Sequence, residues 1–261
     1  MKINYIEFAN TLRDTAVRAG LKIMEIRSGN LGVQIKGDSS PVTIADQEAE
    51  KIILKDIRKV APDIPIIAEE SVSAGEIPET KEKFWLVDPL DGTKEFIGGG
   101  TDFTVNIALI ENGEPTFGII YVPATGKLYT AFGSEKAVLQ NVTDGIINDE
   151  ETTITIRPTP EDGMTAVASK SHMDEKTASF LEEHNIKDTV SVGSSLKFCI
   201  VATGGADIYP RFGPTMEWDI AAGHAILKAA GGTVTNPDGS PFEYQKKGYL
   251  NGAFIAKGNV S

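Results

Sequence analysis

The chain has 261 residues, 41% of them hydrophobic, which is enough for one large core or two modest lobes. It carries 25 Lys and Arg against 37 Asp and Glu, and this net charge of −12 argues against binding to a nucleic-acid polymer. A single cysteine, Cys199, excludes an intramolecular disulfide, and no apolar run reaches the roughly 18–20 residues of a membrane-spanning helix. We expect a cytoplasmic protein and leave open a peripheral association with the inner membrane.

The N-terminal segment predicts two helices. Apolar residues recur at helical spacing over residues 3–28, and a polar loop over residues 29–41 follows. A second helix is predicted from about Thr43 to Lys59, with Thr43 as its cap. Asp46 lies in its first turn and has two interpretations: ordinary compensation of the helix dipole, or a carboxylate directed into a functional site.

Two predicted strands end in acidic residues. The strand at 64–68 is followed by Glu69-Glu70-Ser71, and the buried strand at 84–87 by Asp88-Pro89-Leu90-Asp91-Gly92-Thr93. Pro89 offers no N–H, so we expect the strand ladder to end there, and Gly92 lets the backbone turn sharply. Open α/β sheets bind ligands at the carboxyl ends of their strands. If these two strands are neighbours, their carboxylates converge.

Two carboxylates on one constrained turn repel each other unless a cation lies between them. Hard oxygen ligands suit Mg²⁺. The first hypothesis is therefore a magnesium site that handles phosphate. Such a metal would also allow a chain of net charge −12 to bind an anionic substrate.

Alternating and β-branched segments between Phe103 and Gln140 predict a local antiparallel meander, with Asn112-Gly113 as a strong hairpin signal. Two helices and a meander form an α+β lobe. The composition becomes acidic over residues 141–160, where a short strand at 153–156 is also predicted. We therefore divide the chain into an N-terminal α+β lobe, 1–145, and a C-terminal α/β lobe, 146–261.

The C-terminal lobe alternates predicted strands and helices, which indicates a largely parallel sheet covered by helices. The strands are expected at 165–168, 189–192, 207–209, 233–235 and 254–256, and the helices at 174–184, 195–202 and 218–230.

Gly193-Ser194-Ser195-Leu196-Lys197 follows a strand and begins a helix. Free N–H groups, hydroxyls and a lysine at such a position form an anion site, although an ordinary capped helix explains the same pattern. Ser169-Lys170-Ser171-His172 follows a strand in a similar way, and Arg211 lies between aromatic residues. Each of these two signals is weak alone.

Asp219 begins the helix of Trp218-Asp219-Ile220-Ala221-Ala222-Gly223 and is most simply its N-cap. The small residues after it would allow this helix to approach the acidic turn closely, which would make Asp219 a further metal ligand. The three histidines lack zinc-ligand spacing, and neither a nucleophile elbow nor a Walker A pattern is present.

The three acidic motifs resemble, in order and spacing, those of the inositol monophosphatase superfamily of lithium-sensitive, Mg²⁺-dependent phosphatases. Within it, three stretches are similar to the 3′(2′),5′-bisphosphate nucleotidases of the CysQ type; they begin at Asp88, Gly193 and Tyr209. Inositol monophosphatases usually have Thr-Asn where this chain has Lys94-Glu95. Met216-Glu217, before Trp218, departs from the pattern and has no interpretation from sequence.

The resemblance implies a layered αβαβα sandwich with a two- or three-metal site between the lobes. Glu69, Asp88 and the Leu90 carbonyl would hold one Mg²⁺, and Asp88, Asp91 and Asp219 a second. Catalytic roles fall to Asp46, Thr93 and Glu69, with Thr93 oriented by Asp46 and bonded to the attacking water. The expected substrate contacts are Glu69, Leu90, Asp91, Gly92, Thr93, Ser194, Ser195, Lys197, Arg211 and Asp219.

The implied reaction converts 3′-phosphoadenosine 5′-phosphate (PAP) into AMP and phosphate, with PAPS as a further candidate substrate. Ser194, Ser195, Lys197 and Arg211 would contact the phosphate that is not cleaved. Two alternatives stay open: an inositol or sugar monophosphatase with the same site, and a non-catalytic metal or nucleotide sensor. The expected partner is a small nucleotide bisphosphate, and both a monomer and a homodimer agree with the sequence.

Overall fold

The computed structural model describes residues 4–29, 31–35, 41–168 and 175–259. The stretch Ser169-Lys170-Ser171-His172, proposed above as an anion signal, lies outside them, as does the first residue of the helix predicted from 174. The N-terminal segment forms the two expected helices, α1 (Tyr5–Arg27) and α2 (Ile44–Val60). The predicted polar loop between them contains β1 (Gln34–Ile35), which pairs with β2 (Pro41–Val42).

The first of two main sheets has eight strands, in the order β10-β8-β7-β6-β5-β4-β3, with β9 paired to β8. Its neighbours are antiparallel except β3 and β4, which are parallel. The strands are β3 (Ile66–Ala68), β4 (Lys83–Asp91), β5 (Thr104–Glu111), β6 (Glu114–Val122), β7 (Lys127–Phe132), β8 (Lys136–Thr143), β9 (Ile146–Ile147) and β10 (Thr152–Thr153). The meander is confirmed.

The expectation that the β4 ladder ends at Pro89 is wrong. Asp88 pairs with Asn106 and Asp91 with Thr104, so three steps on β4 oppose two on β5. This bulge accommodates the missing N–H of Pro89 and lets pairing resume at Asp91. The strand predicted at 153–156 is also displaced, because pairing to β8 occurs at β10 instead.

The second main sheet has five strands in the order β12-β11-β13-β17-β15. They are β11 (Met164–Ala168), β12 (Ile186–Ser191), β13 (Ile208–Arg211), β15 (Thr233–Thr235) and β17 (Phe254–Lys257). The sheet is mixed rather than largely parallel. β11 is parallel to β12 and β13, whereas β17, which enters from the chain's end, is antiparallel to both of its neighbours.

The remaining elements connect or cover these sheets. They are α3 (Glu69–Ser73), α4 (Thr93–Ile97), α5 (Glu175–Glu183), α6 (Leu196–Ala202), α7 (Glu217–Ala229), η1 (Lys247–Tyr249), and the pair β14 (Thr215–Met216) and β16 (Leu250–Asn251). Across the described residues, no helix combines the length and the apolarity that crossing a bilayer requires.

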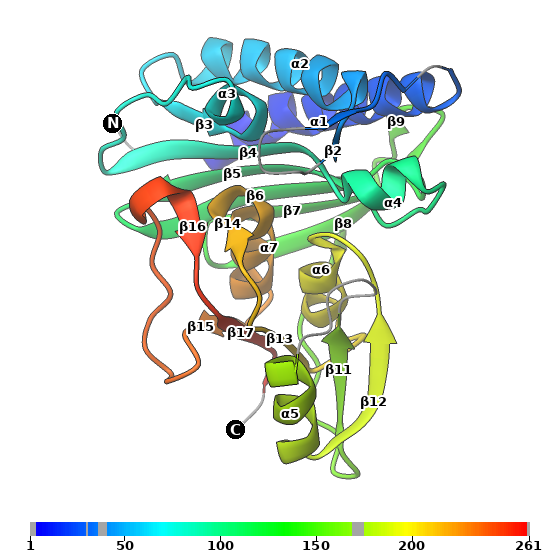
Figure 1. Cartoon of the computed structure of the whole chain (residues 1–261), viewed down its shortest axis with the longest axis vertical. Helices are drawn as coiled ribbons and strands as arrows, with labels where there is room; N and C mark the ends of the chain where they lie inside the picture. The colour runs from blue at the N-terminus through cyan, green and yellow to red at the C-terminus, as the bar shows by residue number, and fades with distance from the viewer. Residues whose placement is uncertain (1–3, 30, 36–40, 169–174, 260–261) are drawn as a thin grey trace.

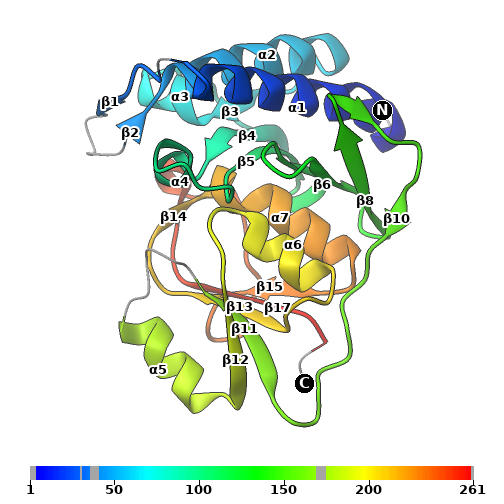
Figure 2. The same ribbon diagram turned by 90° about the vertical axis from the view of Figure 1, so that its right-hand side faces the viewer.

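The molecule has five layers, as expected: α1 and α2, the eight-stranded sheet, α6 and α7, the five-stranded sheet, and α5 (Figures 1 and 2). The apolar run of β4 follows from this arrangement. Trp85 and Val87 pack toward α1 and α2, while Phe84 and Leu86 belong to the core that includes α6, α7 and the second sheet. Side chains alternate along a strand, so a strand buried on both faces is apolar throughout.

Helix α7 packs very closely on the eight-stranded sheet. A Cβ atom built at Gly118 of β6 would lie 2.6 Å from the carbonyl oxygen of Ala222, so only glycine permits this approach. The small residues after Asp219 therefore permit close packing on the sheet, and their predicted approach to the acidic turn stays a prediction. β9 and β10 follow residue 145 but pair with β8 of the first sheet. The division into lobes at residue 145 stays a prediction.

Candidate active site

The Asp46 carboxylate makes contacts in two directions. Its Oδ2 accepts hydrogen bonds from the backbone N–H and the hydroxyl of Thr43, each at 2.7 Å, and so closes a capping box at the start of α2. Its Oδ1 accepts one from the Thr93 hydroxyl at 3.1 Å. Burial raises the pKa of Asp46 against these hydrogen bonds. One carboxylate thus begins a helix and reaches the acidic turn.

The turn between β4 and α4 is held by hydrogen bonds between its own residues. Asp88 Oδ1 accepts from the Leu90 N–H at 3.0 Å, and the Leu90 carbonyl accepts from the Thr93 hydroxyl at 3.1 Å. Gly92 has φ 90°, and a Cβ there would lie 2.8 Å from the Asp102 carbonyl oxygen. Glycine is therefore required by both conformation and space. Thr93 has one proton for two acceptors, so its hydroxyl is oriented by Asp46 and Leu90 together.

The pairing of β3 and β4 confirms that the two acidic strand ends are neighbours. Ala68 lies opposite Val87 in a parallel pair, so Glu69 and Asp88 leave the sheet at the same edge. Burial is the main cause that raises the pKa of Asp88 well above its usual value, and the charges of Glu69, Asp91 and Asp219 add to it. Carboxylates from α3 and α7 thus lie near the two aspartates of β4.

Asp219 comes from the C-terminal part of the chain. It is the third residue of α7 rather than its N-cap, and its Oδ2 accepts from the Met216 N–H at 2.8 Å. The N-cap prediction is wrong because the helix begins two residues earlier, at Glu217. Burial, followed by the charge of Asp91, raises the pKa of Asp219 well above its usual value.

The donor chemistry of this cluster fits Mg²⁺. Asp88 is 2% exposed, and its neighbours in the cluster are carboxylates and a backbone carbonyl, which are hard oxygen donors. So much buried negative charge calls for a cation. Within the described ranges, no three acidic, histidine or cysteine side chains form a ready-made coordination sphere.

The start of α6 faces Asp91. The Ser195 N–H donates to Asp91 Oδ2, and the Ser195 hydroxyl lies 2.8 Å from both Thr104 Oγ1 and Asn106 Oδ1. Ser195 is 2% exposed. Ser195 therefore connects Asp91 with β5. We had expected this residue to contact the substrate.

Lys197 is also buried, and its Nζ lies over the Tyr209 ring, 5.4 Å from the centroid. Burial lowers the pKa of Lys197 to about 8, while nearby Asp91 raises it. For Asp91 the effects are reversed: burial raises its pKa, and the positive charge of Lys197 lowers it. Lys197 is therefore a counter-charge to the cluster.

Ser194 and Arg211 lie beside these residues. Ser194 has φ 48°, an uncommon conformation for serine, and its Oγ accepts from the Leu196 N–H at 3.4 Å. Arg211 donates through Nη2 to the Pro214 carbonyl at 3.1 Å and so braces the loop before α7. Its charge lowers the pKa of Asp219, which places the guanidinium near the cluster.

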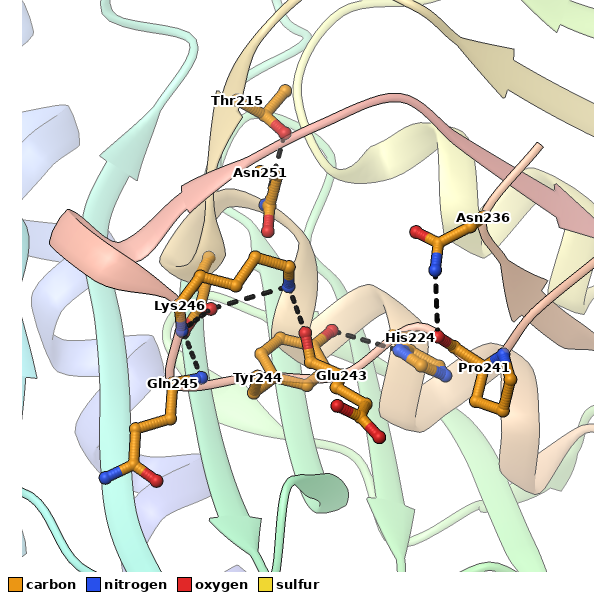
Figure 3. A network of polar contacts seen from close by, with 10 residues as sticks. Thr215, His224, Asn236, Pro241, Glu243, Tyr244, Gln245, Lys246 and Asn251 are labelled. Atoms are coloured by element: carbon orange, nitrogen blue, oxygen red, sulfur yellow. Dashed lines mark hydrogen bonds and ion pairs between the residues drawn. The ribbon is translucent and has the colours of Figure 1, made fainter. Parts of the chain in front are cut away.

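Two buried glutamates near the site escaped the sequence analysis. Glu50 on α2 contacts α3, and Glu217 explains the uninterpreted Met216-Glu217 step. Glu217 is fully buried and accepts from the backbone N–H groups of Gln245 at 3.0 Å and Lys246 at 2.8 Å. Figure 3 shows the polar contacts around Gln245 and Lys246, in which the Tyr244 hydroxyl oxygen lies 3.0 Å from His224 Nδ1. For Glu50, its spacing of four from Asp46 was the available signal.

The five-layered fold and the acidic cluster together define a class of phosphatases, and comparison with known proteins agrees. The model of the inositol monophosphatase family matches residues 4–259. The chain belongs to the inositol monophosphatase family.

Several relatives carry a more specific name. The 3′(2′),5′-bisphosphate nucleotidase CysQ of Escherichia coli K12 is 41% identical over 244 residues, covering 92% of this chain and 95% of the relative. Its namesake in Buchnera aphidicola is 38% identical over 278 residues, covering 98% of each chain.

Solved structures agree with this fold. CysQ from Bacteroides thetaiotaomicron, described as a bacterial member of the inositol monophosphatase family, superposes with a TM-score of 0.80 at 36% identity, covering 97% of this chain and 98% of the other. An IMPase from Thermotoga maritima has a TM-score of 0.78 at 27% identity, covering 96% and 92%.

Proposed function

We propose that the protein is a Mg²⁺-dependent 3′(2′),5′-bisphosphate nucleotidase that removes the 3′-phosphate of PAP to give AMP and phosphate. The observation that carries this proposal is the Asp46–Thr93 hydrogen bond beside the converging carboxylates. The substrate class is supported by relatives named as bisphosphate nucleotidases at 41% identity, compared with 27% for the IMPase structure.

The metal ligands would be those named from the resemblance. Glu69, Asp88 and the Leu90 carbonyl would hold one Mg²⁺, and Asp91 and Asp219 would join Asp88 at a second. When bound, Mg²⁺ lowers the pKa of water and neutralises charge on the phosphoryl oxygens.

The protein's own groups position the reacting atoms. Asp46 orients the Thr93 hydroxyl, whose oxygen is placed to accept a hydrogen bond from the attacking water. The backbone N–H groups of Gly92 and Thr93 would receive phosphoryl oxygens. In-line displacement of a phosphate needs little beyond such positioning and charge neutralisation.

The phosphate that is not cleaved needs hydrogen-bond donors away from the metals. Arg211, which is cationic, and Ser194, which offers a hydroxyl, are the stronger candidates, because Ser195 and Lys197 face Asp91. PAPS, which carries the same two phosphate positions, is a candidate for the same contacts. Failure of Arg211→Ala to raise the KM for PAP would remove Arg211 from this role.

A substrate panel tests the proposed function. Purified protein with Mg²⁺ is incubated with PAP, PAPS, inositol 1-phosphate and fructose 1,6-bisphosphate, and phosphate release is measured with and without a chelator and lithium. We expect PAP to be turned over fastest, with loss of activity in chelator and inhibition by lithium. Faster release from inositol 1-phosphate would instead indicate an inositol phosphatase, and no release from any compound would indicate a sensor.

A further inference from the structure

Glu50 lies four residues after Asp46 on α2, so the two side chains project from the same face of the helix. Both carboxylates are buried, with Asp46 at 0% exposure and Glu50 at 5%. Asp46 extends to Thr93 of the acidic turn. Glu50 extends to the other acidic strand end, the start of α3.

The Glu50 carboxylate accepts three hydrogen bonds from α3. Its Oε2 accepts from the Glu70 N–H at 2.8 Å, and its Oε1 accepts from the Ser71 N–H at 2.9 Å and the Ser71 hydroxyl at 2.7 Å. These two N–H groups belong to the second and third residues of α3, where a helix has no internal acceptor. Glu50 therefore caps α3 from another helix.

α3 depends on this distant cap. It has five residues, and its N-cap position is Ala68, whose methyl side chain cannot accept a hydrogen bond. An isolated helix this short is unstable in water. The first residue of α3 is Glu69, so the direction in which Glu69 leaves β3 depends on how the next two peptide groups are held.

The choice of a carboxylate for this cap has an electrostatic cost. Glu50 accepts from the N–H of Glu70, the residue directly after Glu69, so two negatively charged side chains lie near the start of α3. A neutral acceptor would avoid their repulsion. A carboxylate, however, offers two oxygens in a fixed plane and binds both N–H groups at once, which fixes the orientation of the turn.

We propose that Glu50 is a positioning residue that holds Glu69 in the orientation required for binding Mg²⁺. Helix α2 then aligns both sides of the site, through Asp46 to Thr93 and through Glu50 to Glu69. This inference rests on the proposed function, in which Glu69 is a metal ligand.

The test compares Glu50→Gln and Glu50→Asp with the wild type, and uses Glu48→Gln as the control. Glu48 is on the same helix, its side chain is 38% exposed, and it pairs with Lys51 at the surface. Each protein is titrated with Mg²⁺ in a calorimeter, the Mg²⁺ concentration for half-maximal phosphate release is measured, and the melting temperature is recorded in chelator.

In Glu50→Gln, the amide NH₂ group takes the place of one carboxylate oxygen and faces a backbone N–H of α3. That hydrogen bond is lost, because two donor groups then point at each other. We expect the Mg²⁺ dissociation constant and the half-maximal concentration to rise about 10–100-fold, the usual effect of removing a group that orients a metal ligand. Glu50→Asp should lie between the wild type and Glu50→Gln, and Glu48→Gln should match the wild type. A lower melting temperature with unchanged Mg²⁺ affinity would show a purely structural cap and overturn the inference.

Ser71→Ala covers the case in which Glu50→Gln does not fold. It removes the hydroxyl bond alone and should raise the Mg²⁺ dissociation constant by a smaller factor in the same direction; an unchanged constant counts against the inference. Calorimetry also separates the two proposals. A wild type that binds Mg²⁺ but leaves PAP intact overturns the proposed substrate, while the comparison of variants still decides the role of Glu50.

Discussion

The two halves of the site are built differently. In the N-terminal half, Asp46, Asp88 and Thr93 are joined by hydrogen bonds that begin and end within the first 93 residues. In the C-terminal half, Asp219 accepts a hydrogen bond from the start of its own helix, and α6 is connected to the first half through Ser195. One half is assembled locally, and the other is placed against it by contacts across the molecule.

This difference separates two kinds of sensitivity. Substitutions in the N-terminal half should alter the rate of the proposed reaction, because the hydrogen bonds there orient the groups to which we assign catalytic roles. Apart from the proposed metal ligand Asp219 and the proposed substrate contact Arg211, substitutions in the C-terminal half should alter how well the two halves fit together, and therefore the free energy of unfolding. The following experiments test this separation.

The largest effect is expected from Asp91→Asn, because Asp91 is a proposed metal ligand and also contacts α6. The amide keeps an acceptor for the Ser195 N–H but removes the charge, so phosphate release should fall by about 10³-fold or more. The melting temperature in chelator should not fall, since one of several repelling carboxylates is gone. Asp63→Asn, at an exposed loop position, is the control. Wild-type turnover by Asp91→Asn would contradict the two-metal assignment.

Thr93→Val replaces the hydroxyl by a methyl group of similar shape. Loss of the oriented oxygen should lower kcat by about 10²–10⁴-fold with little change in KM, and Thr93→Ser should restore most of the activity. Steady-state kinetics on PAP measure both effects. If valine and serine behave alike, Thr93 has no role in orienting water.

Acid should remove the stability that one buried histidine of α7 contributes. Burial lowers the pKa of His224 to about 3, from an unfolded value of 6.5, so between these pH values the unfolded state binds a proton that the folded state does not. The contribution of His224 to the free energy of unfolding should therefore fall as pH falls from 6.5, by up to about 1.4 kcal/mol per pH unit, while the buried carboxylates with raised pKa values act in the opposite direction in both proteins. Urea unfolding from pH 7 to pH 4 should show that the wild type loses stability relative to His224→Gln. Equal slopes would contradict this prediction.

Asp56, on a helix of the N-terminal part, should contribute a constant amount of stability over that range. Burial alone would raise the pKa of Asp56, but its hydrogen bonds with Lys59, Arg18 and Thr15 lower it to about 2. Its contribution is complete above its unfolded value of about 3.9 and is lost only as pH falls toward 2. Asp56→Asn should thus leave the slope between pH 6.5 and 4 unchanged.

The smallest effect is expected from Ser195→Ala. It removes the hydroxyl between Thr104 and Asn106 and leaves buried polar atoms unpaired, which should cost about 1–2 kcal/mol of unfolding free energy. Ser194→Ala, one residue earlier, should cost much less. Urea unfolding measures the free energy of unfolding of both variants. An equal decrease for Ser195→Ala and Ser194→Ala would contradict the distinction between the buried Ser195 and its neighbour Ser194.

Much of the N-terminal half was predictable because its signals are local. The run at β4, the acidic residues after two strands and the cap at Thr43 are all legible within short windows. The bulge after Asp88 was not, since it depends on the pairing with β5. The inward direction of Ser195 and the reach of Glu50 to α3 were also hidden, because each joins residues that only the assembled layers bring together.

Gly118 shows how the position of Asp219 could be changed without replacing any of the proposed metal ligands. It lets the backbone of α7 rest directly on β6, and α7 carries Asp219 three residues from Ala222. A single methyl group at Gly118 would push α7 away from β6 and would move the Asp219 carboxylate with the helix. The distance between the proposed metal ligands of the two halves thus depends on how closely α7 packs on the sheet, at a position outside the site itself.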